Sequence, residues 1–414
     1  MLDETLMEQI LSGDNLRRAH RAVIRNKGAP GVDGITVKDI AAHMRQHWPL
    51  IRHKLYEGTY QPALLRGVKI LKSNGGERLL GIPTVQDRMI QHAVQQQLSA
   101  LFEPTFSDYS YGFRPGRSAH DAIGAAQDYV QAGKSWVVDI DISAFFDHVN
   151  HDILMHRVSR RVRDKRVLKL IGGYLRAGMQ LDGEVRKRRE GTPQGGPLSP
   201  LLANIYLDPL DKELERRGLS FSRYADDVNI YVSSERSAER VFESISQWIE
   251  KHLKLTINRD KSGTGRPWER KFLGFRVRED GEIGLAKSSL EAYKERVRQL
   301  WDAKQSLTSH QLIKGWRRYV QGWWNYFGIT VDELVGISSW TRRHMRKCFW
   351  QRWHSRRGRI KKLKKLGVSP RLLKRVDFHA GAWRAARHPA MHTALNNKRL
   401  RQYRLVTPND LAVA

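Results

Sequence analysis

The sequence has almost no cysteine and no long apolar run. Its single cysteine, Cys348, excludes an intramolecular disulfide and a cysteine zinc cluster, and this predicts a reducing, cytoplasmic setting. No apolar run reaches the roughly 18 residues that a membrane helix requires, and the N-terminus lacks a basic segment followed by an apolar one. We therefore expect a protein without a membrane span or a secretory signal.

Acidic residues are also scarce. The 414 residues include 43 Asp and Glu against 73 Lys and Arg, a formal charge of +30, which predicts a polyanionic partner. Residues 341–404 hold 21 Lys and Arg and a single acid, Asp377. Aromatic residues lie among these bases, a composition typical of base stacking combined with phosphate contact: Trp350, Trp353, Phe378 and Trp383.

Two adjacent acids at a turn form the most informative motif. Tyr224–Asp227 lies between the apolar runs Leu219–Arg223 and Val228–Val232, which predicts a β-hairpin with Asp226 and Asp227 at its tip. An ordinary Asp-rich turn would give the same pattern. The hairpin alone therefore does not establish a two-metal phosphoryl-transfer site, and a third carboxylate elsewhere in the sequence is needed to support one.

Candidates for that carboxylate lie in Ser135–Asp147. The apolar strand pattern of this segment is interrupted by Asp139 and Asp141, which alternation places on one face of the strand. An unpaired acid in an apolar strand is costly, so this pattern indicates a function. The alternative is that both acids sit at a strand end and face water.

With further motifs in order, the chain resembles the reverse transcriptase and maturase encoded by bacterial group II introns. Ser135–Asp147 looks like the family's motif A, and Tyr224–Asp227 looks like its motif C. The other matching segments are Gly28–Thr36, Gly75–Thr84, Tyr111–Asp121, Gly191–Asn204, Leu255–Ser262 and Phe272–Phe275. Since no Cys/His module follows them, we expect the compact class without an endonuclease domain, which does not cleave a target strand.

The resemblance implies an α+β right-hand polymerase. Its fingers and palm would combine an antiparallel sheet with helices, followed by a three-helix thumb and a small basic C-terminal domain. The expected parts are an N-terminal extension (1–27), fingers (28–135), palm (136–285), thumb or maturase X domain (286–366) and DNA-binding D domain (367–414). Apolar residues at helical spacing mark the three thumb helices, with their aromatic residues expected in the core: Leu290–Leu300, Trp316–Phe327 and Ile337–His344.

On this resemblance, two Mg²⁺ ions are held by a small set of residues: Asp141, Ile142, Asp226 and Asp227. Asp139 and Asp147 would support them, although Asp139 lies only two residues from Asp141 and is the less certain exclusion. The nearby His148 and His151 could suggest another metal site, but their position favours a helix-start and surface role.

The nucleotide-binding residues implied by the family are Lys72, Arg78, Phe146, Gln194 and Lys261. Lys72 and Arg78 flank a turn that could close on a triphosphate. Leu71 stands where the family usually has proline, so Lys69 competes with Lys72 for this role.

Each of the other three residues has a structural alternative. Phe146 matches the bulky residue that excludes a ribose hydroxyl, unless it only packs in the core, as its neighbour Phe145 is expected to do. Gln194, in a Pro-Gln-Gly-Gly sequence, would touch the forming base pair, or its glycines would serve only a strained turn. Lys261 would lie near the leaving pyrophosphate as a general acid or be a surface lysine.

The expected function is RNA-directed DNA polymerase, a nucleotidyltransferase that makes cDNA from group II intron RNA and acts as maturase in splicing and retrohoming. Its partners would be intron RNA, a primer strand, target DNA and deoxynucleoside triphosphates. The residues expected to contact nucleic acid are Arg114, Arg117, Arg356, Arg357, Lys361, Lys362, Lys364 and Lys365. Two alternatives are a domesticated reverse transcriptase in repair or phage defence and an RNA-binding splicing cofactor with little polymerase activity.

Overall fold

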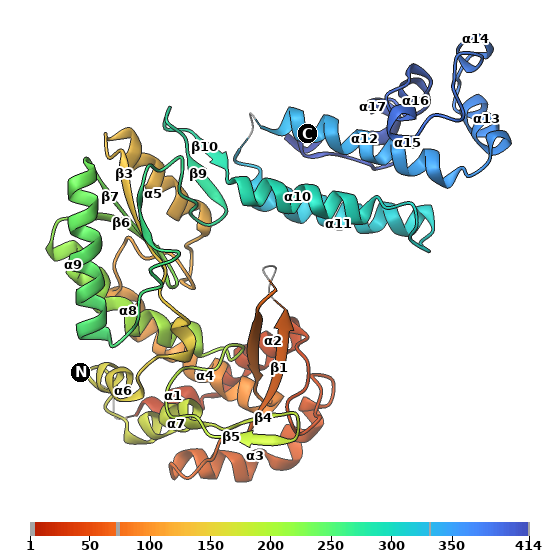
Figure 1. Ribbon diagram of the computed structural model, residues 1–414. Coiled ribbons are helices and arrows are strands. Elements are labelled where there is room, and N and C mark those ends of the chain that lie inside the picture. Colours follow the sequence, from red (N-terminus) through yellow and green to blue (C-terminus); the bar gives the residue numbers. More distant parts are fainter. Residues whose placement is uncertain (1–4, 72–74, 331–332, 413–414) are drawn as a thin grey trace. The chain divides into compact units, whose positions relative to one another are not determined.

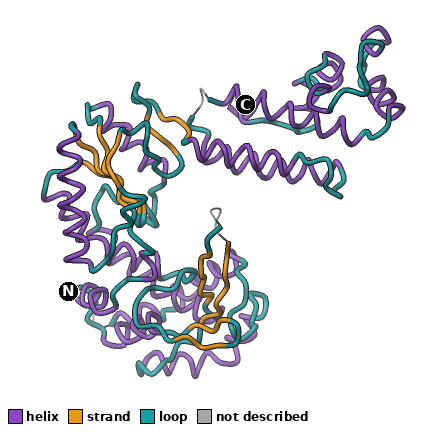
Figure 2. Tube along the Cα trace, viewed as in Figure 1, coloured by secondary structure: helices purple, strands orange, loops and turns teal. Residues whose placement is uncertain are grey.

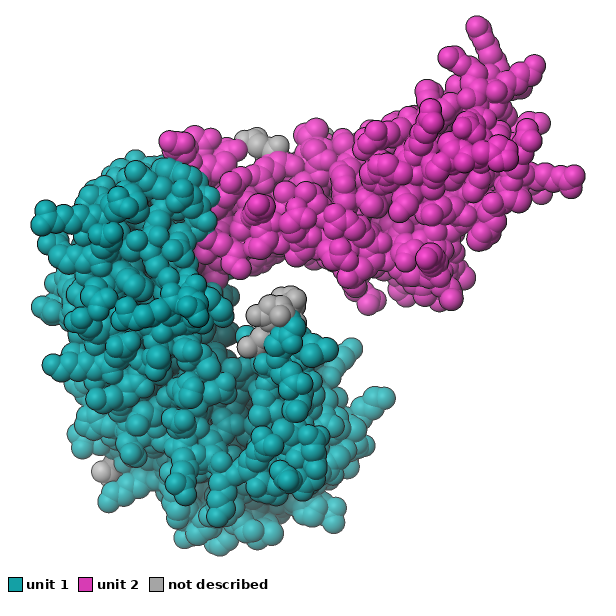
Figure 3. Space-filling model, viewed as in Figure 1, with its two compact units in different colours: residues 1–270 teal, residues 271–414 magenta. Residues whose placement is uncertain are grey.

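The computed structural model describes residues 5–71, 75–330 and 333–412. The chain divides into two compact units, residues 1–270 and 271–414 (Figure 3). Helices predominate in both, and most of the strands belong to the first unit (Figure 2). The predicted α+β class is confirmed. Within the described residues, no helix combines the length and the apolar character needed to cross a membrane.

The first unit contains nine of the described α-helices and two sheets (Figure 1). Its helices are α1 (Leu6–Ile10), α2 (Gly13–Asn26), α3 (Ile40–Tyr56), α4 (Val85–Phe102), α5 (Ala119–Gln131), α6 (His151–Ser159), α7 (Lys165–Arg176), α8 (Ser199–Arg216) and α9 (Glu235–Leu253), with short 3-10 turns η1 (Glu103–Thr105) and η2 (Phe145–Asp147). Its strands are β1 (Leu65–Leu71), β2 (Glu77–Ile82), β3 (Trp136–Ile140), β4 (Met179–Leu181), β5 (Glu184–Arg186), β6 (Ser220–Tyr224), β7 (Asp227–Val232) and β8 (Gly263–Gly265).

The sheet that carries the acidic motifs has the strand order β6-β7-β3-β8, with antiparallel pairing throughout. The predicted hairpin is β6 and β7, and β3 lies beside β7 as its other neighbour. Val138 and Ile140 on β3, and Val228 and Ile230 on β7, are buried in the core of the unit. Alternation therefore turns the intervening residues, including Asp139, to the opposite face.

The N-terminal extension predicted for residues 1–27 forms α1 and α2, apart from residues 1–4, which lie outside the described residues. Both helices belong to the core of the first unit. Met7 and Ile10 are fully buried, and the Asn15 side-chain amide donates to the carbonyls of Ile10 (2.8 Å) and Ala93 (2.9 Å). The amphipathic face of α2 thus packs on α4.

The second sheet has the order β2-β1-β4-β5, and its strands come from both sides of the boundary predicted between fingers and palm. Strands β4 and β5 lie within residues 136–285, which were assigned to the palm, yet β4 pairs in parallel with β1. Leu65, Ala177 and Met179 form a small apolar cluster at this junction. Local apolar pattern does not reveal a partner more than 100 residues away, so the prediction did not include this pairing.

The second unit is a helical bundle preceded by a short hairpin. Its elements are β9 (Phe275–Val277), β10 (Ile283–Leu285), α10 (Lys287–Leu300), α11 (Ser309–Phe327), α12 (Leu334–Arg352), α13 (Arg356–Lys365), α14 (Pro370–Leu373), α15 (Ala382–Ala385), α16 (Pro389–Ala394), α17 (Asn397–Gln402) and α18 (Pro408–Ala412). The three predicted thumb helices are α10, α11 and α12. Tyr293, Trp316 and Trp323 are buried between them, which confirms that the aromatic stripe is core.

The segment after Gly367 shares this core. Met391, Leu395, Leu400 and Leu405 belong to the same apolar cluster as Trp316. The Trp316 indole donates to the carbonyl of Val406 (2.7 Å), and Arg342 on α12 pairs with Asp410 (2.8 Å). In its packing, residues 368–412 are therefore not the separate small domain predicted for 367–414. Four-to-six-residue helices cannot bury enough apolar surface alone, so they cover the thumb helices instead.

We expect a chain ending at Gly367 to lose the cooperative folding of the second unit. A milder variant, Leu395→Ala, should lower the free energy of unfolding by about 2–4 kcal/mol, because it leaves a cavity in the shared core. Urea denaturation followed by circular dichroism measures this. Lys398→Ala, an exposed residue of the same segment, is the control and should change stability by less than about 0.5 kcal/mol. A truncated chain as stable as the full one would identify the segment as a dispensable tail.

Candidate active site

The register of β3 and β7 brings the acidic motifs together. Ile140 pairs with Val228, so continuing the antiparallel ladder by one residue sets Asp141 opposite Asp227. Asp226 lies in the turn between β6 and β7 and is partly buried. Burial raises the pKa of Asp226, and the nearby negative charge of Asp141 raises it further. Asp141 and Asp226 are therefore neighbours that repel each other.

The backbone of Asp141 is held by the segment Leu255–Ser262. The Ser262 hydroxyl accepts from the Asp141 amide (2.8 Å), and the Asn258 amide donates to the Asp141 carbonyl (2.9 Å). A β-bridge joins Ile142 to Ile257 just beyond. This segment matched a family motif in the sequence, and its contacts give that motif a structural role.

Asp139 has different surroundings from Asp141. Its carboxylate lies 3.9 Å from a guanidinium nitrogen of Arg270, and its strand position pairs with Asn229. Asp141 instead lies 4.0 Å from the Lys261 ammonium and influences Asp226. The geometry thus favours Asp141 as the acid that works with the hairpin, and Asp139 as a support.

Carboxylates are the ligands that hard divalent cations prefer. Of the residues whose positions are described, no three His, Cys, Asp or Glu side chains converge into a preformed metal site. Mg²⁺ typically binds one or two carboxylates and completes its shell with water and substrate phosphates, so this donor set fits such an ion. Ile142 has a buried apolar side chain, and only its backbone carbonyl could be a ligand.

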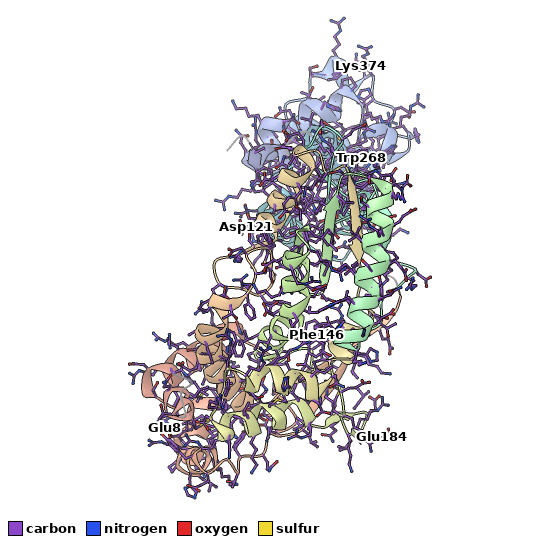
Figure 4. The ribbon with its side chains drawn as sticks, turned by 90° about the vertical axis from the view of Figure 1, so that its left-hand side faces the viewer. Glu8, Asp121, Phe146, Glu184, Trp268 and Lys374 are labelled. Atoms are coloured by element: carbon purple, nitrogen blue, oxygen red, sulfur yellow. The ribbon has the colours of Figure 1, made fainter. Side chains whose placement is uncertain are left out.

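A cleft of about 480 Å³ lies in the first unit. Arg78, Phe146 and Gln194, three of the predicted nucleotide-binding residues, lie along it. The positive charge of Arg78 also opposes the rise in the Asp226 pKa, so Arg78 faces both the cleft and the acids. Phe146 follows β3 in turn η2 and is labelled in Figure 4. Its ring is partly exposed and packs edge-on against Phe145, which is buried as predicted.

The loop that carries Gln194 is shaped by its glycines. The Gln194 carbonyl accepts from the Gly81 amide (2.9 Å), and the Thr192 amide donates to the carbonyl of Phe146 (2.7 Å). Gly195 has φ +125°, and a Cβ on Gly196 would lie 2.6 Å from the Gln91 side-chain oxygen. The backbone conformation therefore favours glycine at Gly195, while a side chain at Gly196 would displace the end of the Gln91 side chain. The loop joins Gln194 to Phe146 through the backbone.

The hairpin formed by β1 and β2 carries one of the two lysines that compete for the nucleotide-binding role. Lys72 lies outside the described residues. Lys69, its competitor, lies on β1 with its ammonium 3.5 Å from Glu77 across the hairpin, and both side chains are half exposed. This solvent-screened pair leaves Lys69 able to exchange partners. The alternative therefore stays open.

Arg88 is a cleft residue that the motifs did not indicate. Its Nε and one terminal nitrogen are buried without a hydrogen-bond partner, and burial lowers its pKa. Unpaired buried donors are costly and uncommon. Its neighbours Met89 and Ile90 are apolar, but Gln86, Asp87 and Gln91 are polar, so no local pattern distinguishes Arg88.

Two arginines predicted to contact nucleic acid serve the fold instead, to different degrees. The Arg114 side chain is only 4% exposed, pairs with Glu103 (2.8 Å) and donates to the carbonyls of Ser107 and Ser110. The prediction that Arg114 contacts nucleic acid is therefore wrong, because its guanidinium is buried and its donors already bind groups within the fold. Arg117 pairs with Asp108 (2.6 Å) and keeps a quarter of its side chain exposed.

The six remaining predicted nucleic-acid residues all fall on one helix, α13. These exposed bases are Arg356, Arg357, Lys361, Lys362, Lys364 and Lys365. His151 lies in the first turn of α6, after the N-cap Asn150, and its ring contacts the carbonyl of Gly191 (2.8 Å). The predicted helix-start role of His151 is confirmed, but its predicted surface role is wrong, because the side chain is buried.

Arg114→Gln should lower the free energy of unfolding by about 2–3 kcal/mol, because it leaves Glu103 and two buried carbonyls without their donor. RNA affinity per folded molecule should stay near wild type. Urea denaturation and filter binding at fixed salt measure the two quantities. Arg117→Gln is the control, with a smaller loss of stability. Wild-type stability combined with weaker RNA binding by Arg114→Gln would restore the original prediction.

Comparisons with known proteins agree with one another. Residues 70–277 match the family described as reverse transcriptase (RNA-dependent DNA polymerase), and residues 290–367 match the group II intron maturase-specific domain. Protein YkfC of Escherichia coli is 34% identical over 299 residues, covering 63% of this chain and 78% of YkfC.

The group II intron-encoded protein LtrA of Lactococcus lactis subsp. cremoris is 37% identical over 219 residues. That match covers 53% of this chain and 36% of LtrA, so the matched part spans about a third of that relative. A telomerase structure from Candida albicans has a TM-score of 0.44 at 12% identity, covering 80% of this chain and 68% of the telomerase chain.

Proposed function

Because the chain belongs to the reverse transcriptase family and carries a group II intron maturase domain, we propose that it copies group II intron RNA into cDNA and assists splicing and retrohoming of that intron. The single observation that supports this best is the junction of the acids with the cleft. Arg78 lines the cleft that holds Phe146 and Gln194, and its charge also acts on Asp226. A nucleotide in the cleft would thus lie beside the acids.

The proposed reaction is nucleotidyl transfer: a primer 3′-hydroxyl attacks the α-phosphate of a deoxynucleoside triphosphate, and the bond to pyrophosphate breaks. Reverse transcriptases use divalent metal ions, and we assign two Mg²⁺ ions to Asp141, Asp226 and Asp227. When bound, such ions stabilise the attacking and leaving oxygens. The repulsion between Asp141 and Asp226 favours cation binding, since a cation relieves it.

The remaining cleft residues would bind and select the nucleotide. Arg78 and Arg88 offer donors to phosphate oxygens, and Arg88 already has two buried donors without partners. Lys261, 4.0 Å from Asp141, would protonate the leaving pyrophosphate. Phe146 would exclude a 2′-hydroxyl from the sugar site. Gln194 would contact the forming base pair from its glycine-shaped loop.

Helix α13 is the proposed contact for intron RNA or target DNA. Seven of its ten residues are Lys or Arg, and none is acidic. Exposed like charges on one short helix repel each other, and phosphates relieve that repulsion. A cytoplasmic location is proposed from the single cysteine alone.

Of the two alternatives, a splicing cofactor without polymerase activity is less well supported, because all three metal acids are retained. A domesticated reverse transcriptase in repair or phage defence would use the same residues. Intron RNA sequence flanking the gene would distinguish it from the proposed intron-encoded enzyme.

Asp226→Ala should abolish cDNA synthesis on a primed RNA template with Mg²⁺, because one of the proposed metal-binding acids is lost. RNA affinity should stay close to wild type, since phosphate contacts elsewhere dominate binding. Primer extension and filter binding measure the two. Glu184→Ala, an exposed acid on β5, is the control and should extend normally. Near-normal extension by Asp226→Ala would end the metal assignment, and loss of activity in Asp139→Asn but not Asp141→Asn would reverse the choice between those acids.

Phe146→Val should admit ribonucleotides, because discrimination by steric exclusion is lost when the ring is removed. The measurement is the ratio of kcat/KM for a deoxynucleotide to that for the matching ribonucleotide. Phe113→Val, from another segment of the same cleft, should leave that ratio unchanged. An active Phe146→Val enzyme with an unchanged ratio would show that Phe146 serves only packing.

A further inference from the structure

A buried ion pair lies directly beneath the acidic turn. Arg223, the residue before Tyr224, and Asp211 on α8 are both fully buried. The guanidinium donates to both carboxylate oxygens of Asp211, at 2.7 and 2.6 Å. This two-bond geometry is the strongest that an arginine and a carboxylate form. A pair so costly to desolvate needs an explanation beyond stability.

The same guanidinium holds the turn itself. A terminal nitrogen of Arg223 donates to the carbonyl of Ala225 (2.7 Å) and to the side-chain oxygen of Asn204 (3.1 Å). Ala225 has φ +59°, the left-handed region that residues with a Cβ rarely adopt. Strain of this kind persists only where the surroundings impose it. The Arg223 hydrogen bond is such a constraint, and it acts on the residue just before Asp226.

A second segment of the chain contacts the turn at Gly112. The Asn204 amide nitrogen donates to the carbonyl of Gly112 (2.9 Å). A Cβ on Gly112 would lie 2.3 Å from the Ala225 amide nitrogen, so only glycine allows this approach. Asn204 and Asp211 lie seven residues apart on α8, two helical turns, and therefore share one face.

Helix α8 also begins at the nucleotide cleft. Ser199 and Pro200, at its start, line that cleft, and the Ser199 hydroxyl donates to the carbonyl of Pro193 next to Gln194 (2.6 Å). Helix α8 thus contacts the loop that carries Gln194 at its N-terminal end and the acidic turn farther along. We propose that Asp211, acting through Arg223, is a positioning residue that sets the Asp226 turn for metal binding and fixes its distance from the nucleotide loop.

This inference rests on the proposed metal role of Asp226, and it assigns Asp211 and Arg223 no contact with substrate. The test variant is the double substitution Asp211→Leu with Arg223→Met. Replacing both charges with apolar side chains of similar size keeps the packing and leaves no unpaired charge, so the fold should persist. The hydrogen bond to Ala225 is lost.

Binding of Mn²⁺ to the full chain, titrated by electron paramagnetic resonance, is the first readout, with Asp226→Ala as the reference for a lost site. We expect the double variant to bind Mn²⁺ about 10–100-fold more weakly than wild type, the usual cost of removing a partner that orients a metal ligand. Its kcat for primer extension should fall by a similar factor. The KM for the deoxynucleotide should change less, because the cleft residues are untouched.

Two further variants separate positioning from general stability. Glu213→Gln, on the same helix but paired with Arg216 and Arg217 instead of the acidic turn, should match wild type in Mn²⁺ affinity and kcat. Arg223→Lys keeps the buried charge for Asp211 but lacks the planar fork that reaches Ala225 as well. It should fold, as a thermal melt will show, and still bind Mn²⁺ more weakly.

A folded double variant, or a folded Arg223→Lys, with wild-type Mn²⁺ affinity and kcat would overturn the inference. Equal Mn²⁺ binding by wild type and Asp226→Ala would overturn it together with the metal assignment. Absence of cDNA synthesis by the wild-type chain, with Mn²⁺ binding that still depends on Asp226 and on the Arg223 pair, would contradict only the proposed function.

Discussion

The candidate site depends on the antiparallel register of β3 with β7. Val138 and Ile140 on one strand and Val228 and Ile230 on the other are buried on the core face, and this burial specifies the pairing. A slip of one residue would turn every apolar side chain outward and Asp139 inward. The same burial that stabilises the sheet therefore places Asp141 beside the acidic turn.

Besides the strand register, contacts from two segments distant in sequence fix the positions of Asp141 and of the acidic turn. Ser262 and Asn258 hold the backbone at Asp141, more than 100 residues upstream. Arg223 joins the turn at Ala225 to α8. Each acid is thus fixed by hydrogen bonds from a different segment. Opposed carboxylates need such support, since their repulsion would otherwise move them apart.

Local patterns predicted the parts of the structure that are local in origin. The hairpin at Tyr224–Asp227, the helix start at Asn150 and the thumb helices follow from alternation, capping and helical spacing, which neighbouring residues determine. Arg114, Arg223 and Asp211 could not be assigned in this way, because a charge in a sequence looks the same whether water or a buried partner satisfies it. The one available signal was position: Asp211 sits among Leu207, Leu210 and Leu214 of a helix that is buried on several faces.

The same distinction changes how the net charge of +30 should be interpreted. Arg114, Arg223, Arg342 and Arg346 use their donors on carboxylates or carbonyls within the fold. Removing one of them leaves an internal partner unpaired, so its loss would reduce stability more directly than affinity. Within the part of the chain that the structure describes, the exposed bases of α13 form no ion pair with an acid. Four of them are lysines, whose ammonium groups can contact phosphate. The charge count alone therefore overstates the surface that can bind nucleic acid, and burial identifies which bases belong to it.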